Sequence, residues 1–232
     1  MVATRILRAM PLDNSDLEKM PPANKNFHKN VFINCPFDTE YYSLLRPLVF
    51  TIAYLVFTPR IALETSDSGE SRIEKICDLI RSSKYSVHDL SRLKAARRGE
   101  FYRLNMPFEL GVDYGARRLS SSRLRTKRFL ILESRAYDYK RALSDISGLD
   151  IKPHGNEPIK MVQAIRNWFV ETVGLENVDG PTVIWYSFND FASDFNARRR
   201  SEGFSKDDLN MMPIPEYVRF IKSWIRSRSM HP

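Results

Sequence analysis

One short segment of the sequence combines residue types and spacings that suit chemistry. Residues 105–111 read Asn-Met-Pro-Phe-Glu-Leu-Gly, so Asn105 and Glu109 are four positions apart and share one face of a helix. Glu109 has apolar neighbours, and a carboxylate in such surroundings either caps a helix, pairs with an arginine, or is a reactive group tuned by burial. The plainer interpretation is a partly exposed glutamate with Arg103 beside it. Asn105 is expected to cap the helix that starts there.

Other polar residues gather where apolar, β-branched segments end. Residues 31–35 (VFINC) read as a buried strand, and segments 60–64, 85–90 and 129–132 read as further strands. In an open parallel sheet, ligands bind in the crevice beyond the carboxyl ends of the strands. This rule selects the following candidate side chains: Asp38, Glu64, Asp67, Asp89, Ser91, Arg92, Arg103, Asn105 and Glu109.

Helical patterns alternate with these strands. The expected helices cover residues 39–57, 70–83, 106–117 and 159–173, and a fifth strand is expected over 149–151. The alternation and the short connections predict parallel strands joined by right-handed crossovers. We therefore expect an α/β fold, with an open parallel sheet flanked by helices.

The chain divides by composition into three parts. Residues 1–26 read as a flexible tail, 27–175 as the α/β domain, and 176–232 as a mainly helical C-terminal extension. Within the extension, the pattern predicts a strand over 183–186 and helices over 189–200 and 216–226. The last helix is apolar on one face, which either docks on the protein's own core or binds a partner or second copy.

Composition narrows the classes of function. Among 232 residues, 36 are Lys or Arg and 28 are Asp or Glu, and the net charge of +8 favours anionic partners such as nucleotides, nucleic acid or acidic proteins. Two cysteines are too few for a disulfide scaffold and are expected to be free thiols. No metal-ligand spacing and no glycine-rich phosphate loop is present, so no metal and no resident cofactor are expected. No signal peptide or membrane-spanning segment is visible, which predicts a cytoplasmic protein without membrane contact.

Several further residues have plainer explanations. His88 precedes Asp89 in a strand, so its side chain points to the opposite face, and we expect it to pack in the core. Cys35 has no histidine partner in the sequence and is a weak candidate for a nucleophile. The basic run 117–128 is either a solvated loop or a contact for nucleic acid or an acidic partner. Asp145, Asp150 and His154 either form a polar cluster at the end of a later strand or, in the plainer explanation, have turn and capping roles.

The order of the motifs resembles that of a known superfamily. VFINCPFD (31–38), SVHDLSR (86–92) and NMPFELGVDYGARR (105–118), followed by a strand, are similar to the pattern of bacterial TIR-like and nucleoside 2-deoxyribosyltransferase-like proteins. The resemblance covers residues 30–133. It implies a flavodoxin-like sheet and cleavage or transfer at an N-glycosidic bond, with NAD or a related nucleotide or nucleoside as substrate.

The resemblance also implies roles for individual residues. Glu109 matches the catalytic carboxylate, which would stabilise the oxocarbenium-like ribose or attack its anomeric carbon. Phe37 would stack on a base, and Arg92 or Arg103 would hold a phosphate. The full set of implied substrate-binding residues is Phe37, Asp38, Asp89, Ser91, Arg92, Arg103 and Asn105.

The sequence departs from the superfamily pattern at Asp113 and Tyr114, where apolar residues are expected. By resemblance, such a protein would be an anti-phage defence or toxin effector, switched on by a partner protein, by nucleic acid or by assembly of copies. Two other classes stay open. One is a non-catalytic nucleotide sensor that uses the same crevice, and the other is an adaptor that binds protein or nucleic acid through its basic loop and last helix.

Overall fold

The computed structural model of the protein describes residues 26–93 and 104–229. The expected tail, residues 1–26, lies outside this part except for Asn26, as do the loop 94–102 and Arg103. No helix within the described ranges is long and apolar enough to cross a membrane.

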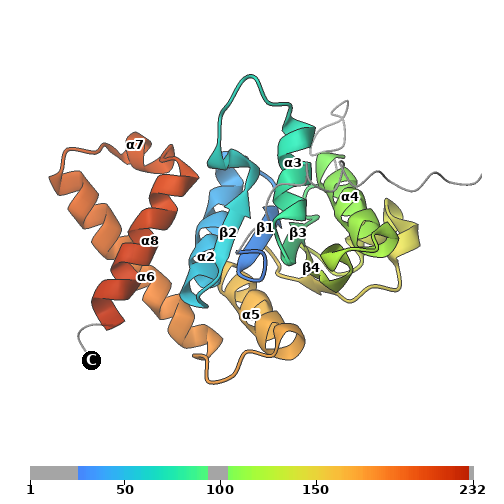
Figure 1. Ribbon diagram of the computed structural model, residues 1–232. Coiled ribbons are helices and arrows are strands. Elements are labelled where there is room, and N and C mark those ends of the chain that lie inside the picture. The colour runs from blue at the N-terminus through green and yellow to red at the C-terminus, as the bar shows by residue number, and fades with distance from the viewer. Residues whose placement is uncertain (1–25, 94–103, 230–232) are drawn as a thin grey trace, which may run out of the picture.

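A five-stranded, all-parallel sheet forms the centre of the fold (Figure 1). The strands in chain order are β1 (Asn30–Asn34), β2 (Thr58–Ile61), β3 (Tyr85–Asp89), β4 (Arg128–Glu133) and β5 (Ile151–Pro153). Their order across the sheet is β2-β1-β3-β4-β5, which is the flavodoxin-like order. The chain reverses its direction of winding between β1 and β3, so the general rule for open α/β sheets places a ligand crevice beyond the carboxyl ends of these two strands.

Helices cover both faces of the sheet, and the alternation of side chains along β1 shows how. The helices that flank the sheet are α2 (Tyr42–Tyr54), α3 (Arg72–Arg81), α4 (Asn105–Leu119) and α5 (Pro158–Trp168). Val31 and Ile33 belong to the apolar cluster built with α2 and α5, whereas Phe32 between them packs with α3 and α4. The expected flavodoxin-like α/β architecture is therefore confirmed.

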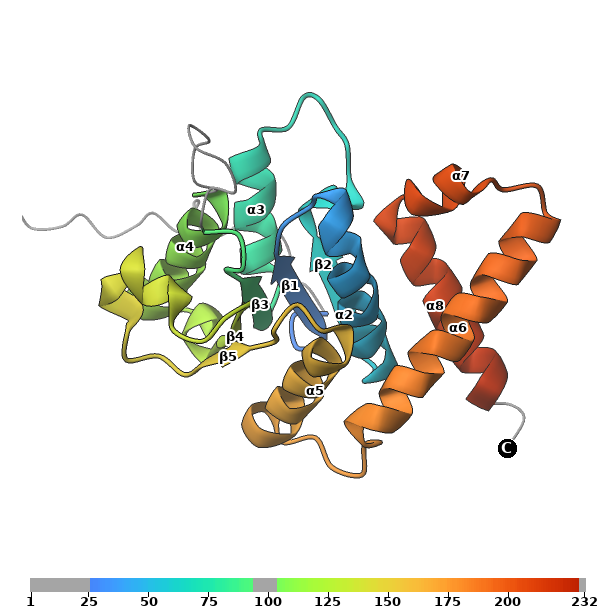
Figure 2. The same cartoon turned by 180° about the vertical axis from the view of Figure 1, so that it is seen from behind.

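The C-terminal extension consists of α6 (Pro181–Ser201), α7 (Lys206–Asn210) and α8 (Ile214–Ser229) and packs against the outer side of α2 (Figure 2). Phe50 of α2 meets the rings of Phe188, Phe191 and Trp224 at centroid distances of 5.5–6.0 Å. The apolar face of the last helix thus docks on the protein's own core. The strand expected over 183–186 is wrong, because α6 starts with Pro181 and runs through these residues.

Short turns of helix explain the remaining differences from expectation. They are η1 (Thr39–Tyr41), η2 (Ala62–Glu64), η3 (Arg123–Thr126), η4 (Asp138–Arg141), η5 (Ser144–Ile146) and the π-helical turn η6 (Phe169–Val173). The second strand ends at Ile61 because Glu64 folds back in η2 and accepts a hydrogen bond from the Ile61 N–H at 2.7 Å. Asn105 is the first residue of α4 rather than its cap, and the capping residue, Leu104, makes no side-chain bond.

Candidate functional site

A cavity of about 650 Å³ lies at the carboxyl end of β1, at the switch point of the sheet. Its wall is formed by Asn34, Cys35, Pro36, Phe37, Asp38, Arg72, Leu104, Asn105, Met106 and Glu109. These residues come from the last residue of β1 and the turn after it, from the start of α3, and from the start of α4 with the residue before it. The cavity therefore occupies the place that the sheet topology marks out for a ligand.

Glu109 is the buried acid of this cavity. The residue is 4% exposed, and the guanidinium Nη2 of Arg72 donates a hydrogen bond to its Oε1 over 3.3 Å. Burial raises the pKa of Glu109, and the charge and hydrogen bond of Arg72 offset this only in part. Half of the Arg72 side chain is exposed, so the carboxylate is held by a partner that is itself accessible to a ligand.

Phe37 and Asp38 line the same cavity. The Arg72 guanidinium lies 5.8 Å from the centre of the Phe37 ring, which places a cation, an aromatic ring and a carboxylate on one wall. Asp38 also has a structural task, because its Oδ1 accepts a hydrogen bond from the Tyr41 N–H at 3.0 Å and caps η1. The structure thus brings together Asp38, Asn105 and Glu109, which the strand-end rule selects, and Phe37, which the resemblance implies.

Asp89 does not join them, and this corrects the expectation that it shares their pocket. It is the last residue of β3 and fully buried. Its carboxylate accepts hydrogen bonds from the hydroxyls of Tyr41 and Ser91, from the Ser91 N–H at 2.8 Å and from His154 Nε2 at 3.1 Å. Burial alone would raise the pKa of Asp89, but hydrogen bonds and the charge of His154 outweigh it and lower the pKa.

The pleat of β3 explains the separation. His88 reaches α4, where its Nε2 lies 3.1 Å from Asp113, so the next residue, Asp89, must point to the α2 and α5 side. Of its partners, Tyr41 directly precedes α2, and His154 lies in the turn between β5 and α5. Glu109 and Asp89 therefore lie on opposite faces of one sheet edge.

Ser91 and Arg92 border a second, smaller cavity of about 280 Å³ on the Asp89 side. The Nη2 atom of Arg92 forms ion pairs with Oδ1 of Asp38 at 3.2 Å and with Oε2 of Glu40 at 3.0 Å. Neither Ser91 nor Arg92 lines the larger cavity.

Cys35 is a cavity residue without the character of a nucleophile. Its thiol is buried, and burial together with the negative charges of Asp89, Glu109 and Asp38 raises its pKa well above the ordinary value. The thiol is accordingly neutral. Among the described residues, no cluster of three or more His, Cys, Asp or Glu side chains is placed to hold a metal ion.

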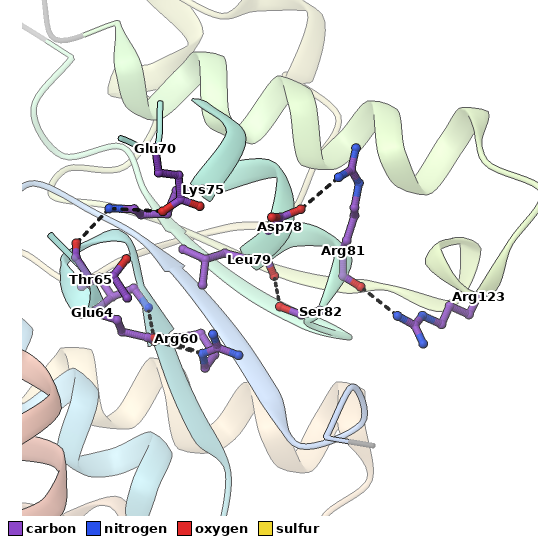
Figure 3. A pocket seen from close by; sticks show the side chains of 11 residues that line it. Arg60, Glu64, Thr65, Glu70, Lys75, Asp78, Leu79, Arg81, Ser82 and Arg123 are labelled. Carbon is purple, nitrogen blue, oxygen red and sulfur yellow. Dashed lines mark hydrogen bonds and ion pairs between the residues drawn. The ribbon is translucent and has the colours of Figure 1, made fainter. Parts of the chain in front are cut away.

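A groove of about 490 Å³ between β2 and α3 offers a contrast (Figure 3). Figure 3 shows its charged side chains paired with one another: Arg60 with Glu64, Lys75 with Glu70, and Arg81 with Asp78. Glu64 is thus turned away from the crevice, and Asp67 accepts a bond from the Gly69 N–H in a local turn. None of the described residues that line this groove is a buried acid comparable to Glu109.

Sequence reasoning missed three residues of this sheet edge. Arg72 was overlooked because it lies eleven residues beyond Ile61, in the first turn of α3. For His154 the sequence favours a turn or capping role over a polar cluster at a strand end, but the residue directly follows β5 and so meets the strand-end rule. Asn34, the last residue of β1, was treated as part of the strand.

The basic run divides into exposed and buried members. Lys127 is fully buried and bonded to the carbonyl oxygens of Ile80 and Ser83, so it is not part of a basic surface. Arg117, Arg118 and Arg123 instead lie over the aromatic rings of Phe129, Tyr114 and Phe27, respectively.

Comparison with known proteins does not assign the chain to a family. The chain matches no protein-family model, no curated protein and no solved structure.

Proposed function

We propose that this protein cleaves the N-glycosidic bond of NAD or a related nucleotide or nucleoside in the cavity at the carboxyl end of β1. The observation that carries the proposal is Glu109: a buried carboxylate at the switch point, with a raised pKa and, within the part of the chain that the structure describes, one half-exposed arginine as its partner. Groups with shifted pKa values in a cleft are frequent at catalytic sites. The resemblance of the ELG segment to the superfamily named above supports the same residue.

The other residues of the wall suit a nucleotide. A volume of about 650 Å³ falls in the range of small-molecule sites. Phe37 offers a ring for stacking on a base, and Arg72 offers a guanidinium for a phosphate or pyrophosphate. Asn105 is exposed at the start of α4 and is available to a ligand at the mouth of the cavity.

The proposed reaction needs one carboxylate and water. The electron pair of the C1′–N bond leaves with the base, and positive charge develops on the ribose ring. The Glu109 carboxylate stabilises that charge in surroundings of low polarity, where electrostatic stabilisation is strong. Water then supplies the hydroxyl on C1′ and releases a proton; an acceptor base in place of water would give transfer instead of hydrolysis.

The biological setting is part of the proposal. A cytoplasmic effector of anti-phage defence or a toxin, switched on by a partner or by assembly, would deplete nucleotides in this way. Both cysteines, Cys35 and Cys77, are unpaired, which agrees with a reducing compartment.

The experiment compares nucleotide pools by mass spectrometry in cells that express the wild type, Glu109→Gln or Glu40→Gln. Glu40 is a matched control because it also pairs with an arginine at this sheet edge but lies outside the cavity. We expect loss of NAD or of one nucleoside class, with release of its free base, in the wild type and in Glu40→Gln only. Equal loss in all three would contradict the role of Glu109, and unchanged pools throughout would favour the nucleotide sensor.

A further inference from the structure

A chain of buried polar side chains runs from the floor of the cavity into the core. Asn34, Ser86, His88, Asp113 and Lys127 are all between 0% and 2% exposed. Burying charged groups such as Asp113 and Lys127 costs several kcal/mol per ion, and well-packed apolar residues usually serve stability as well or better. Such a chain therefore calls for a role other than stability.

The hydrogen bonds of Asn34 fix the orientation of its amide. Nδ2 donates to the backbone oxygen of Met106 at 2.8 Å and to Nδ1 of His88 at 3.1 Å. A carbonyl oxygen can only accept, so the nitrogen of Asn34 must face Met106. Both amide hydrogens then donate to groups of the protein. Since Asn34 lines the cavity, the polar atom with which it can bind a ligand there is the acceptor Oδ1.

The next residues of the chain lock His88 in one tautomer. Since Nδ1 accepts from Asn34, the ring proton is on Nε2, which donates to Oδ2 of Asp113 at 3.1 Å. The edges of Phe32 and Phe129 hold the imidazole ring, each with centroids 5.9 Å away.

The far end of the chain keeps Asp113 ionised. Ser86 donates to its Oδ2 at 2.5 Å, and Lys127 Nζ lies 3.2 Å from Oδ1. Burial would raise the pKa of Asp113, but these partners and His88 outweigh it and lower the pKa. A carboxylate at this position can only accept, so the donors of Asn34 and His88 both point toward Asp113.

We infer that Asn34 is the sugar-recognising residue of the cavity: its Oδ1 accepts a hydrogen bond from a ribose hydroxyl, and His88 and Asp113 are positioning residues that hold the amide in that orientation. The inference rests on the proposed function for the ribosyl nature of the ligand. The side chain of Asn34 lies on the α3 and α4 side of the sheet, the side on which Arg72 and Glu109 enclose the cavity. A preorganised acceptor discriminates strongly against an analogue that lacks the hydroxyl, because the buried acceptor is then unpaired.

The test measures binding of adenosine 5′-monophosphate and its 2′-deoxy and 3′-deoxy forms to the full chain carrying Glu109→Gln. In this background Asn34→Leu is compared with Asn30→Leu. Asn30 is a matched control, since it is also a buried asparagine of β1 with an internal bond, from its Nδ2 to Ser82 O at 2.8 Å, but it does not line the cavity. We expect Asn34→Leu to weaken binding of the ribose form about tenfold and to abolish the preference over one deoxy form, whereas Asn30→Leu leaves both unchanged.

A second measurement needs no change at Asn34. In the Glu109→Gln protein, the side-chain amide signals of Asn34 and Asn30 are followed by NMR while adenosine monophosphate or NAD is added. Movement of the Asn34 signal alone supports the inference; an unmoved Asn34 signal, or equal loss of binding in both leucine variants, overturns it. Turnover of the wild type is measured separately. A protein that turns over its substrate but shows no role for Asn34 would therefore support the proposed function and contradict the inference.

Discussion

Two buried carboxylates at the same sheet edge have opposite surroundings. Asp89 is fully buried and is bonded by Tyr41, Ser91 and His154, and its pKa is lowered. Glu109 is almost as buried, but among the described residues it has one half-exposed partner, Arg72, and its pKa is raised. The difference shows that burial alone does not set the direction in which the pKa of an acid shifts, since the hydrogen-bond donors and charges around its oxygens can outweigh burial.

The comparison assigns the two residues different tasks. Asp89 joins η1, the end of β3 and the turn before α5, so its bonds hold the edge together. Glu109 lines the cavity, where its carboxylate oxygens can accept hydrogen bonds from a ligand. The following predictions test this division, beginning with the largest effect.

Glu109→Gln is expected to lower kcat by about 10³-fold or more, because the neutral amide cannot stabilise positive charge on the ribose. The fold should persist, since glutamine fills the same space and can still accept from Arg72. Turnover is measured alongside the thermal unfolding midpoint. A variant that retains wild-type kcat would remove Glu109 from the mechanism.

Asp89→Ala is expected to destabilise the fold by about 3 kcal/mol, because Tyr41 and His154 are left without their buried acceptor. Turnover per folded molecule should stay close to the wild type. Urea unfolding gives the first quantity, and activity normalised to the folded fraction gives the second. A loss of kcat without loss of stability would show that Asp89 acts in the reaction.

Arg72→Gln is expected to lower kcat/KM about tenfold and to shift the acidic limb of its pH profile to higher pH. The reason is that Arg72 favours the ionised form of Glu109, so its removal raises the pKa of that carboxyl further. Arg60→Gln is the control, since Arg60 also pairs with a glutamate but lies in the groove beside β2. If the acidic limb of the pH profile does not shift in Arg72→Gln, the ion pair between Arg72 and Glu109 does not affect the proposed reaction.

The smallest expected effect is a difference of sign in the pH dependence of stability. The lowered pKa of Asp89 gives stability that is present above the unfolded pKa of about 3.9 and is lost as the pH falls through the folded pKa. The raised pKa of Glu109 does the reverse: ionisation costs stability as the pH rises from about 4.3 through the folded pKa. At pH 7, Asp89→Asn should therefore be less stable than the wild type, and Glu109→Gln slightly more stable.

The difference for Glu109→Gln should disappear below about pH 4, where that carboxyl group is protonated in both the folded and the unfolded chain. The difference for Asp89→Asn should only begin to shrink below about pH 4, because the folded pKa of Asp89 lies lower still. Thermal melts of the three proteins between pH 3 and pH 7 provide the comparison. Differences of the same sign for the two variants would contradict the contrast between the sites.

Much of the fold could be predicted from the sequence, because buried strands and amphipathic helices have distinct periods. The error over 183–186 arose because four residues do not distinguish a strand from the first turn of a helix, and Pro181 is the better signal. For the site, the strand-end rule grouped Asp38 and Glu109 correctly. It misplaced Asp89 because the rule names an edge of the sheet and not a face.

The face of the sheet to which Asp89 points could have been predicted from the alternation of side chains along β3. Since His88 and Asp89 are adjacent, only one of them can face α4, and the acidic Asp113 there is the natural partner of the histidine. Arg72 could not be predicted in this way, because its position depends on how long the chain runs after β2 before it returns to the edge.

The most direct test of the account incubates purified wild type, Glu109→Gln and Asp89→Asn with NAD and a panel of ribonucleosides, and measures the released base by mass spectrometry. The account predicts that the wild type and the folded fraction of Asp89→Asn release one and the same base, and that Glu109→Gln releases none. Base release by Glu109→Gln at the wild-type rate, or its loss in Asp89→Asn alone, would contradict it.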